Sequence, residues 1–288
     1  VEHTGNMRAS GSAPVVGFLL AVLCAHVLAQ TCGGRPPNVI VIMLDDLGYH
    51  DLSINGSDDV RSPNIDKLLR DGCIFTEGYS VAGFCSPARA GYFTGIHPYH
   101  SGHQRNPARD DKDTLSGLPL YLTTLPETLK AKGYKSAMIG KWHLGVFAGG
   151  DPLSRGFDYF MGFLGSGFPY FEYRKPFRKA FEYIFEQYKI FKGVTYLTDN
   201  FTAAAMKFMT KNKNEPFFIT LAYNAVHGPY DYKESDVDPW VSEDRVPHVA
   251  MIKAVDRGVA KLRRRIDQLG LTKCTMIAFT NDNGGHAN

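Results

Sequence analysis

The chain has 288 residues, of which 44% are hydrophobic and 21% are charged, and its formal net charge is +3. This is ordinary globular composition, and the charge is too small to indicate a nucleic-acid partner. The length suits one large α/β domain better than two small ones.

The N-terminal stretch, residues 1–29, differs from the rest of the chain. Met7-Arg8 is followed by the apolar run PVVGFLLAVLCAHVLA, which ends in Val27-Leu28-Ala29. A basic start, an apolar core and small residues before the cleavage point predict a secretory signal peptide, with residues 1–6 upstream of the start. A membrane anchor is the alternative, but the run is shorter than the ~20 residues that a span needs. We therefore expect the secretory pathway, an extracellular or lysosomal destination, and no membrane span after cleavage.

Secretion permits disulfides, and four cysteines remain after the signal: Cys32, Cys73, Cys85 and Cys274. If all four paired, the chain would carry two disulfides, and the sequence leaves the connectivity open. We interpret Cys73 and Cys274 as buried or paired rather than reactive. Asn55 and Asn200 begin glycosylation sequons that a eukaryotic host could use.

The first part of the chain predicts one strand and two helices. The run NVIVIML at 38–44 is apolar and β-branched, as expected of a strand buried on both faces. A helix follows, with Ser62 as its N-cap and Gly72 at its end. A second helix is expected to begin at or just after Cys85, because Pro87 suits a first helical turn.

The middle of the chain continues the alternation. Thr124 caps a predicted helix that ends at Gly133, and the run KSAMIG at 135–140 predicts a strand. The basic and aromatic segment 173–193 is interpreted as an amphipathic insertion that packs its Phe and Tyr side chains on the body.

The last predicted elements are strands at 216–224 and 274–280 with a helix at 249–270 between them. Its Arg263-Arg264-Arg265 run is interpreted as a solvated helix face. Alternating strands and helices predict an α/β fold with a mostly parallel central sheet and helices on both faces.

Each of the four predicted strands runs into polar side chains, which are Asp45 and Asp46, Lys141 and His143, His227, and Asp282 and Asn283. Ligands of such sheets bind beyond the carboxyl ends of the strands, so we expect these groups to form one site. The aspartates and Asn283 are an oxygen-only set, which favours Ca²⁺ or Mg²⁺ over zinc. If Asp45-Asp46 or Asp282-Asn283 occurred alone, a helix N-cap followed by a loop carboxylate would be the simpler interpretation.

The remaining groups suit an anionic substrate. Lys141 and His143 are two residues apart and can reach the same ligand, where the lysine charge favours an oxyanion and the histidine can move a proton. Cys85 at a helix N-terminus faces free N–H groups that favour negative charge, and Arg89 follows one turn later. Together with His227, this set fits transfer of a sulfate or phosphate ester beside a cation.

The stretch CSPARAGYFTG resembles the sulfatase signature Cys-x-Pro-x-Arg followed by Thr-Gly, and DDLGYHD, GKWHLG, HGPY and NDNGGH occur in sulfatase order. Over about 37–288 the chain resembles the arylsulfatase-like N-terminal domain of the type I, formylglycine-dependent sulfatases. The resemblance implies an alkaline phosphatase/sulfatase-like fold and assigns 35–288 to the catalytic domain. That domain is expected to be incomplete, because the family places a further sulfate-binding lysine and a smaller domain after the last of these motifs.

The resemblance also implies a mechanism. Cys85 would be oxidised to formylglycine by a formylglycine-generating enzyme; one oxygen of the hydrated aldehyde, a gem-diol, would attack sulfur, and the other would release sulfate. The implied residue roles are as follows. One Ca²⁺ would be bound by Asp45, Asp46, Asp282 and Asn283 together with residue 85. Arg89 and Lys141 would hold the gem-diol and the sulfate, and His143 would assist collapse of the intermediate. His227 would face the leaving oxygen, and Ser166 would be a looser match to a sulfate-site residue.

The resemblance therefore implies a sulfatase that acts on a sulfate ester, such as a sulfated glycan. Two other functions compete with this interpretation. A phosphatase or phosphodiesterase of the same superfamily would use Ser or Thr as nucleophile and two zinc ions. An inactive, truncated sulfatase-like binding protein is the non-enzymatic alternative. The histidines of GIHPYHSGH, which are His97, His100 and His103, give only a weak indication of a second metal site, because no carboxylate or cysteine accompanies them.

Overall fold

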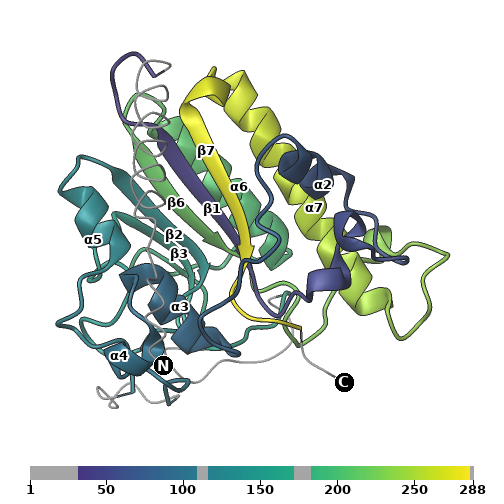
Figure 1. The fold of residues 1–288 in the computed structure, drawn as a ribbon, viewed down its shortest axis with the longest axis horizontal. Coiled ribbons are helices and arrows are strands. Elements are labelled where there is room, and N and C mark those ends of the chain that lie inside the picture. The colour runs from purple at the N-terminus through teal and green to yellow at the C-terminus, as the bar shows by residue number, and fades with distance from the viewer. Residues whose placement is uncertain (1–31, 109–115, 172–182, 286–288) are drawn as a thin grey trace, which may run out of the picture.

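The computed structural model describes residues 32–108, 116–171 and 183–285. Its centre is a seven-stranded sheet in the order β5-β4-β3-β2-β6-β1-β7 (Figure 1). The strands are β1 Asn38–Leu44, β2 Lys135–Lys141, β3 Tyr159–Phe163, β4 Phe185–Glu186, β5 Lys189–Ile190, β6 Phe217–Ala222 and β7 Thr275–Asn281. The neighbouring strands β3, β2, β6, β1 and β7 pair in parallel, whereas β4 pairs antiparallel with β3 and with β5. The predicted α/β class with a mostly parallel sheet is confirmed.

Helices cover both faces of this sheet (Figure 1). They are α2 Pro63–Arg70, α3 Cys85–Thr94, α4 Pro98–Ser101, α5 Leu125–Lys130, α6 Leu197–Lys211 and α7 Val246–Gln268. Successive residues of a strand point to opposite faces, so β1 contributes to two cores. Ile40 and Ile42 pack with residues of α2, α6 and α7, whereas Val41 and Met43 pack with residues of α3.

The predicted elements agree with the structure to within a few residues. The largest shifts are at α7, which begins at Val246 rather than at 249 with a proline in its first turn, and at α5, which ends at Lys130 rather than at 133. The strand expected at 274–280 is β7, and a short 3-10 turn, Thr272–Cys274, precedes it. Of the segment 173–193, residues 173–182 lie outside the described residues, and residues 183–193 contain the β4–β5 hairpin.

The cysteine interpretation was half right. Cys274 forms a disulfide with Cys32, which fastens the segment before β1 to the start of β7. Cys73, however, is exposed and is a free thiol, because the stretch that follows α2 runs over the surface rather than into the core. Cys85 is free and buried.

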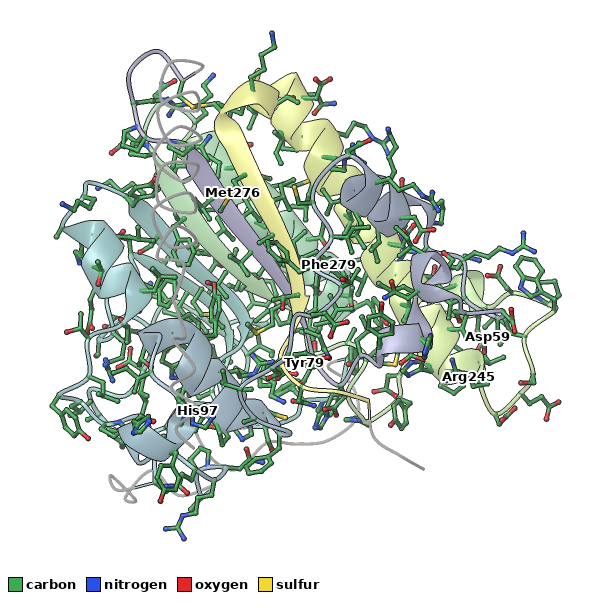
Figure 2. All side chains as sticks on the ribbon, in the orientation of Figure 1. Asp59, Tyr79, His97, Arg245, Met276 and Phe279 are labelled. Atoms are coloured by element: carbon green, nitrogen blue, oxygen red, sulfur yellow. A yellow bond between two sulfur atoms is a disulfide. The ribbon has the colours of Figure 1, made fainter. Side chains whose placement is uncertain are left out.

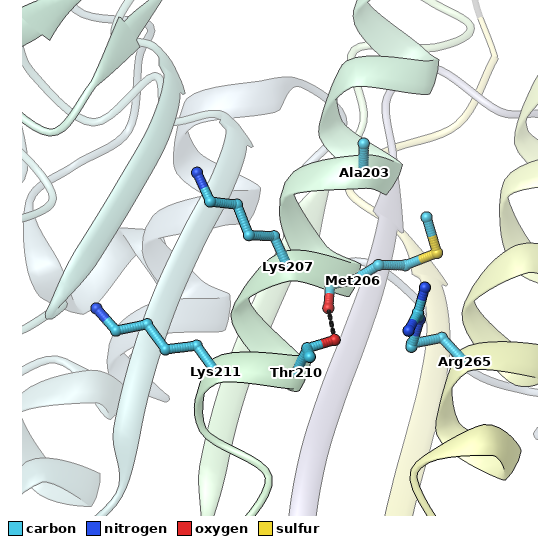
Figure 3. A pocket seen from close by; sticks show the side chains of 6 residues that line it. All are labelled: Ala203, Met206, Lys207, Thr210, Lys211 and Arg265. Carbon is cyan, nitrogen blue, oxygen red and sulfur yellow. Dashed lines mark hydrogen bonds between the residues drawn. The ribbon is translucent and has the colours of Figure 1, made fainter.

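The arginine run of α7 is mostly at the surface. Arg263 forms an ion pair with Asp71, and Arg264 is exposed. Arg265 lines a shallow groove of about 490 Å³ between α6 and α7. In Figure 3 the ends of Lys207 and Lys211 point away from Arg265. The three positive charges of the groove therefore do not converge on one position. The groove lies near the end of α6 that leads into β6, at the opposite edge of the sheet from the predicted site.

At the other end of α7, the loop that follows β1 is fastened by charge. Arg245 Nε lies 2.7 Å from Asp59 Oδ2, and the two side chains are labelled side by side in Figure 2. Among the described residues, no helix has the length and hydropathy that crossing a bilayer requires.

Candidate active site

Three neighbouring strands place the acidic residues together. β1 lies between β6 and β7, so the residues that follow these strands meet at one edge. Asp45 N donates to Ala225 O beyond β6 at 2.9 Å, and Asp282 N donates to Leu44 O at the end of β1 at 3.1 Å. Backbone hydrogen bonds therefore hold Asp45 close to Asp282. The next residues, Asp46 and Asn283, meet through a hydrogen bond between their side chains across a sequence separation of 237 residues.

The oxygen atoms of this cluster converge. One carboxylate oxygen from each of Asp45, Asp46 and Asp282 lies within 4.8 Å of the others, and all three residues are buried. Asn283 Nδ2 donates to Asp46 Oδ1 at 2.5 Å. Asp45 Oδ1 and Asn283 Oδ1 are buried and accept no hydrogen bond from the described residues. Buried oxygen acceptors without donors fit a hard cation such as Ca²⁺, which binds carboxylate and amide oxygens.

Two buried cations offset part of the acidic charge. Lys141 Nζ lies 2.5 Å from Asp45 Oδ2, and Arg89 Nη2 lies 2.8 Å from Asp282 Oδ2, with all four side chains fully buried. Arg89 Nη1 also donates to Lys141 O at 2.6 Å. A buried charge is tolerated only when it is paired, so these four groups form one electrostatic unit.

The pKa values follow from this arrangement. Burial alone would raise the pKa of Asp45, but the charges of Lys141 and Arg89 outweigh it and lower that pKa below its usual range. Burial, followed by the charge of Asp45, raises the pKa of Asp282 to about 6. A bound divalent cation would favour the ionised form of both.

Cys85 is the first residue of α3, where the predicted helix begins. Its Sγ lies within 4.8 Å of a carboxylate oxygen of Asp45 and of a ring nitrogen of His227. Burial, together with the charge of Asp45, raises the pKa of the Cys85 thiol to about 12. The thiol is therefore protonated at neutral pH, and an unmodified Cys85 is a poor nucleophile in this site.

The end of β2 brings Lys141 and His143 to the cluster. Gly140 has φ 110°, and a Cβ there would lie 1.8 Å from Ala222 O, so only glycine allows this close approach of β2 to β6. His143 follows in the left-handed region with φ 58°. Its ring is buried, and burial together with the charges of Lys141 and Arg89 lowers its pKa well below the usual value. His143 is thus neutral.

His227 occupies the more open side of the site. A quarter of its side chain is exposed, and its Nε2 lies 3.8 Å from Asp46 Oδ2. A Cβ at Gly167 would lie 3.2 Å from His227 Cε1, so the segment containing the half-buried Ser166 passes this ring. The hydroxyl of Tyr170 donates to the carbonyl oxygens of Asn224 and His227, at 2.5 Å and 2.9 Å, and fixes the loop.

The structure adds residues that the sequence did not indicate. Tyr170 carries no motif signal. His103 belonged to the weak metal pattern, but the three histidines of that pattern do not gather: His97 and His100 are exposed, whereas His103 is buried with Nε2 2.6 Å from Ser86 Oγ. Ser86 stands beside Cys85, at a position that the Cys-x-Pro-x-Arg signature leaves open.

Comparison with known proteins identifies the family. The sulfatase family model matches residues 37–288. The chain belongs to the sulfatase family. It is 32% identical over 283 residues to the N-acetylgalactosamine-6-sulfatase of Mus musculus, covering 92% of this chain and 54% of that protein. It is 31% identical to the arylsulfatase J of Mus musculus, covering 93% of this chain and 46% of that protein.

Solved structures share the fold of this chain. The crystal structure of Ps i-CgsB in complex with k-i-k-neocarrahexaose matches with a TM-score of 0.81 at 35% identity, covering 87% of this chain and 59% of that one. The phosphonate monoester hydrolase of Agrobacterium radiobacter, at 18% identity and a TM-score of 0.60, shares the fold alone. This sulfatase-family chain spans about half the length of the curated relatives that it matches.

Proposed function

We propose that this chain supplies the catalytic domain, 35–288, of a secreted sulfate-ester hydrolase whose Cys85 is converted to formylglycine by a formylglycine-generating enzyme. The observation that carries the proposal is the position of Cys85, at the start of α3 and within 4.8 Å of an Asp45 oxygen. Residues 1–29 are the proposed N-terminal extension and signal peptide. They lie outside the described residues.

One Ca²⁺ ion is the proposed cofactor. Asp45, Asp46, Asp282 and Asn283 would hold it together with residue 85, and the buried oxygens of Asp45 and Asn283 that accept no hydrogen bond support this assignment. When bound, the ion would withdraw electron density from sulfate oxygens, and the formylglycine would supply an oxygen nucleophile in place of the protonated thiol.

The surrounding side chains have separate tasks in this proposal. Arg89 and Lys141 hold fixed positive charge beside residue 85, where an attacking oxygen and a sulfate group carry negative charge. His143 is neutral and can accept a proton from the hydroxyl of residue 85. His227, on the open side, can give a proton to the leaving oxygen, and Ser166 lies in the segment beside it.

We propose a sulfated glycan as the substrate class. The relative named above acts on N-acetylgalactosamine 6-sulfate by its name, and a similar structure was solved with a neocarrahexaose. The extracellular or lysosomal destination belongs to the same proposal. It rests on the predicted signal peptide.

The test is turnover by the whole chain, secreted from cells that contain the formylglycine-generating enzyme. Peptide mass spectrometry first establishes the aldehyde at residue 85. We expect hydrolysis of an aryl sulfate and release of sulfate from a sulfated oligosaccharide, with no hydrolysis of the matching aryl phosphate and none by Cys85→Ala. Preferential phosphate hydrolysis would establish the phosphatase alternative. No turnover by aldehyde-bearing protein would instead favour the binding protein.

A further inference from the structure

The buried hydroxyl of Ser86 joins two histidines. Ser86 Oγ lies 2.5 Å from His143 O and 2.6 Å from His103 Nε2. The exposed fractions of Ser86, His103 and His143 are 0%, 3% and 2%. Solvent water cannot replace these hydrogen bonds, so the loss of any one of them leaves a buried polar group unsatisfied.

The proton arrangement of this network is determined by its acceptors. His143 O can only accept, so the single hydroxyl hydrogen of Ser86 is directed at it. Ser86 Oγ must then accept from His103, and His103 Nε2 carries a proton. Burial lowers the pKa of His103, and a backbone hydrogen bond with Gly117 opposes part of that shift.

The receiving carbonyl belongs to a residue in an unfavourable conformation. His143 has φ 58°, in the left-handed region that side chains other than glycine seldom adopt. Its N–H donates to Leu164 O at 3.1 Å, and its C=O accepts from Ser86, so the residue is held from both sides. Its ring Nδ1 is buried and makes no hydrogen bond to the described residues, so the place of the ring depends on where the backbone contacts set the Cα–Cβ bond.

The start of α3 has its own anchor. Ser86 N donates to Asn106 Oδ1 at 3.1 Å, so the backbone of the helix start is fastened without His103. The hydroxyl of Ser86 is therefore not needed to fasten the helix start. It instead fixes the distance between Ser86 and the backbone of His143.

We propose that His103 is a positioning residue for the reaction, and that it acts through Ser86 to hold the His143 ring against residue 85. The catalytic part of this inference rests on the proposed function. The positioning part does not, because it concerns the conformation of His143 in the folded chain.

The chain offers matched variants. His103→Phe removes the donor and keeps a buried ring, His103→Gln keeps an N–H donor near the Nε2 position, and Ser86→Ala removes the hydroxyl without added volume. His100→Phe is the control, because His100 lies in the same segment and is exposed. The first readout is the ring Cε1–Hε1 signal of His143 by NMR, and the second is steady-state sulfate-ester hydrolysis.

We expect the His143 signal to move in His103→Phe and Ser86→Ala, and to stay in place in His103→Gln and His100→Phe. We expect kcat to fall roughly tenfold to hundredfold in the first two variants, from the loss of one buried hydrogen bond, with KM within about twofold of wild type. Should His103→Phe fail to fold, Ser86→Ala decides the question. An unmoved His143 signal in a folded Ser86→Ala variant overturns the inference. If wild type hydrolyses no sulfate ester, the proposed function fails, and the NMR signal alone tests the positioning.

Discussion

The guanidinium of Arg89 donates from Nε to Asp282 Oδ2 at 2.9 Å, across a sequence separation of 193 residues. Through this pair, the helix that begins at Cys85 is fastened to the carboxylate that follows β7. A further contact, from Arg89 Nη1 to Lys141 O, adds the end of β2. One side chain therefore joins the helix that begins at Cys85 to two strand ends. The charges that meet at this point lead to measurable expectations.

Calcium should stabilise the folded chain through the acidic cluster. A ligand at a hundredfold excess over its Kd stabilises the folded state by about 2.7 kcal/mol. We expect Ca²⁺ to raise the melting temperature, a chelator to reverse the rise, and Asp46→Asn to weaken the calcium affinity at least tenfold. Asp71→Asn, which alters an acid at the surface, should leave the calcium response intact. If calcium stabilised Asp46→Asn and wild type equally, the calcium site could not be this acidic cluster.

In chain that retains an unmodified thiol at residue 85, Cys85 and Cys73 should differ sharply in reactivity. The thiolate is the reactive form, and burial raises the pKa of Cys85 to about 12, whereas Cys73 is exposed. Alkylation of native protein at pH 7.5, followed by peptide mapping, should label Cys73 at least about a hundredfold faster. Denaturation should abolish the difference. Fast native labelling of Cys85 would contradict the buried site.

Asp51 should make the stability depend on pH in the acid range. Burial would raise its pKa, but His248, the N–H of Gly48 and Arg245 together lower it to about 2. A depressed carboxyl pKa adds stability above the unfolded value of 3.8, and this stability is lost as the pH falls toward 2. We expect Asp51→Asn to cost about 1 kcal/mol at pH 7 after solvent screening is allowed for.

The check is urea unfolding of wild type and Asp51→Asn at several pH values. The difference between them should shrink progressively between about pH 4 and pH 2. Asp58→Asn serves as the control, because Asp58 is exposed in the same loop. A difference that stays constant with pH would mean that Asp51 acts through packing and not through its charge.

Much of the fold could be predicted because it depends on local signals. After Asn38 the run 39–44 is apolar, and β1 is buried on both faces as such a run predicts. The shared position of Asp45 and Asp282 needed one further step, since parallel strands end at the same edge of a sheet. That step required no knowledge of distant contacts.

The rest depends on long-range packing that no local pattern records. His97, His100 and His103 recur every third residue, yet only His103 is buried, because its position faces Ser86. β4 and β5 have two residues each, too few to show a period of two. The pairing of Cys32 with Cys274 follows from β1 lying beside β7, an adjacency that the sequence alone leaves open.

Lys141 should be worth far more to stability than a surface lysine. Its Nζ lies 2.5 Å from Asp45 Oδ2, and both side chains are fully buried. Lys141→Met leaves this buried carboxylate to its longer contact, 3.7 Å, with Arg89 Nη2, which also pairs with Asp282. We expect a loss of about 3–5 kcal/mol in the free energy of unfolding without metal. Lys67→Met breaks an exposed pair with Asp71 and should cause no measurable change. Adding Asp45→Asn to Lys141→Met should recover part of the loss, because the buried charge that lost its closer partner is then removed. If urea unfolding gave Lys141→Met and Lys67→Met the same stability, the buried pair would not be the electrostatic unit described above.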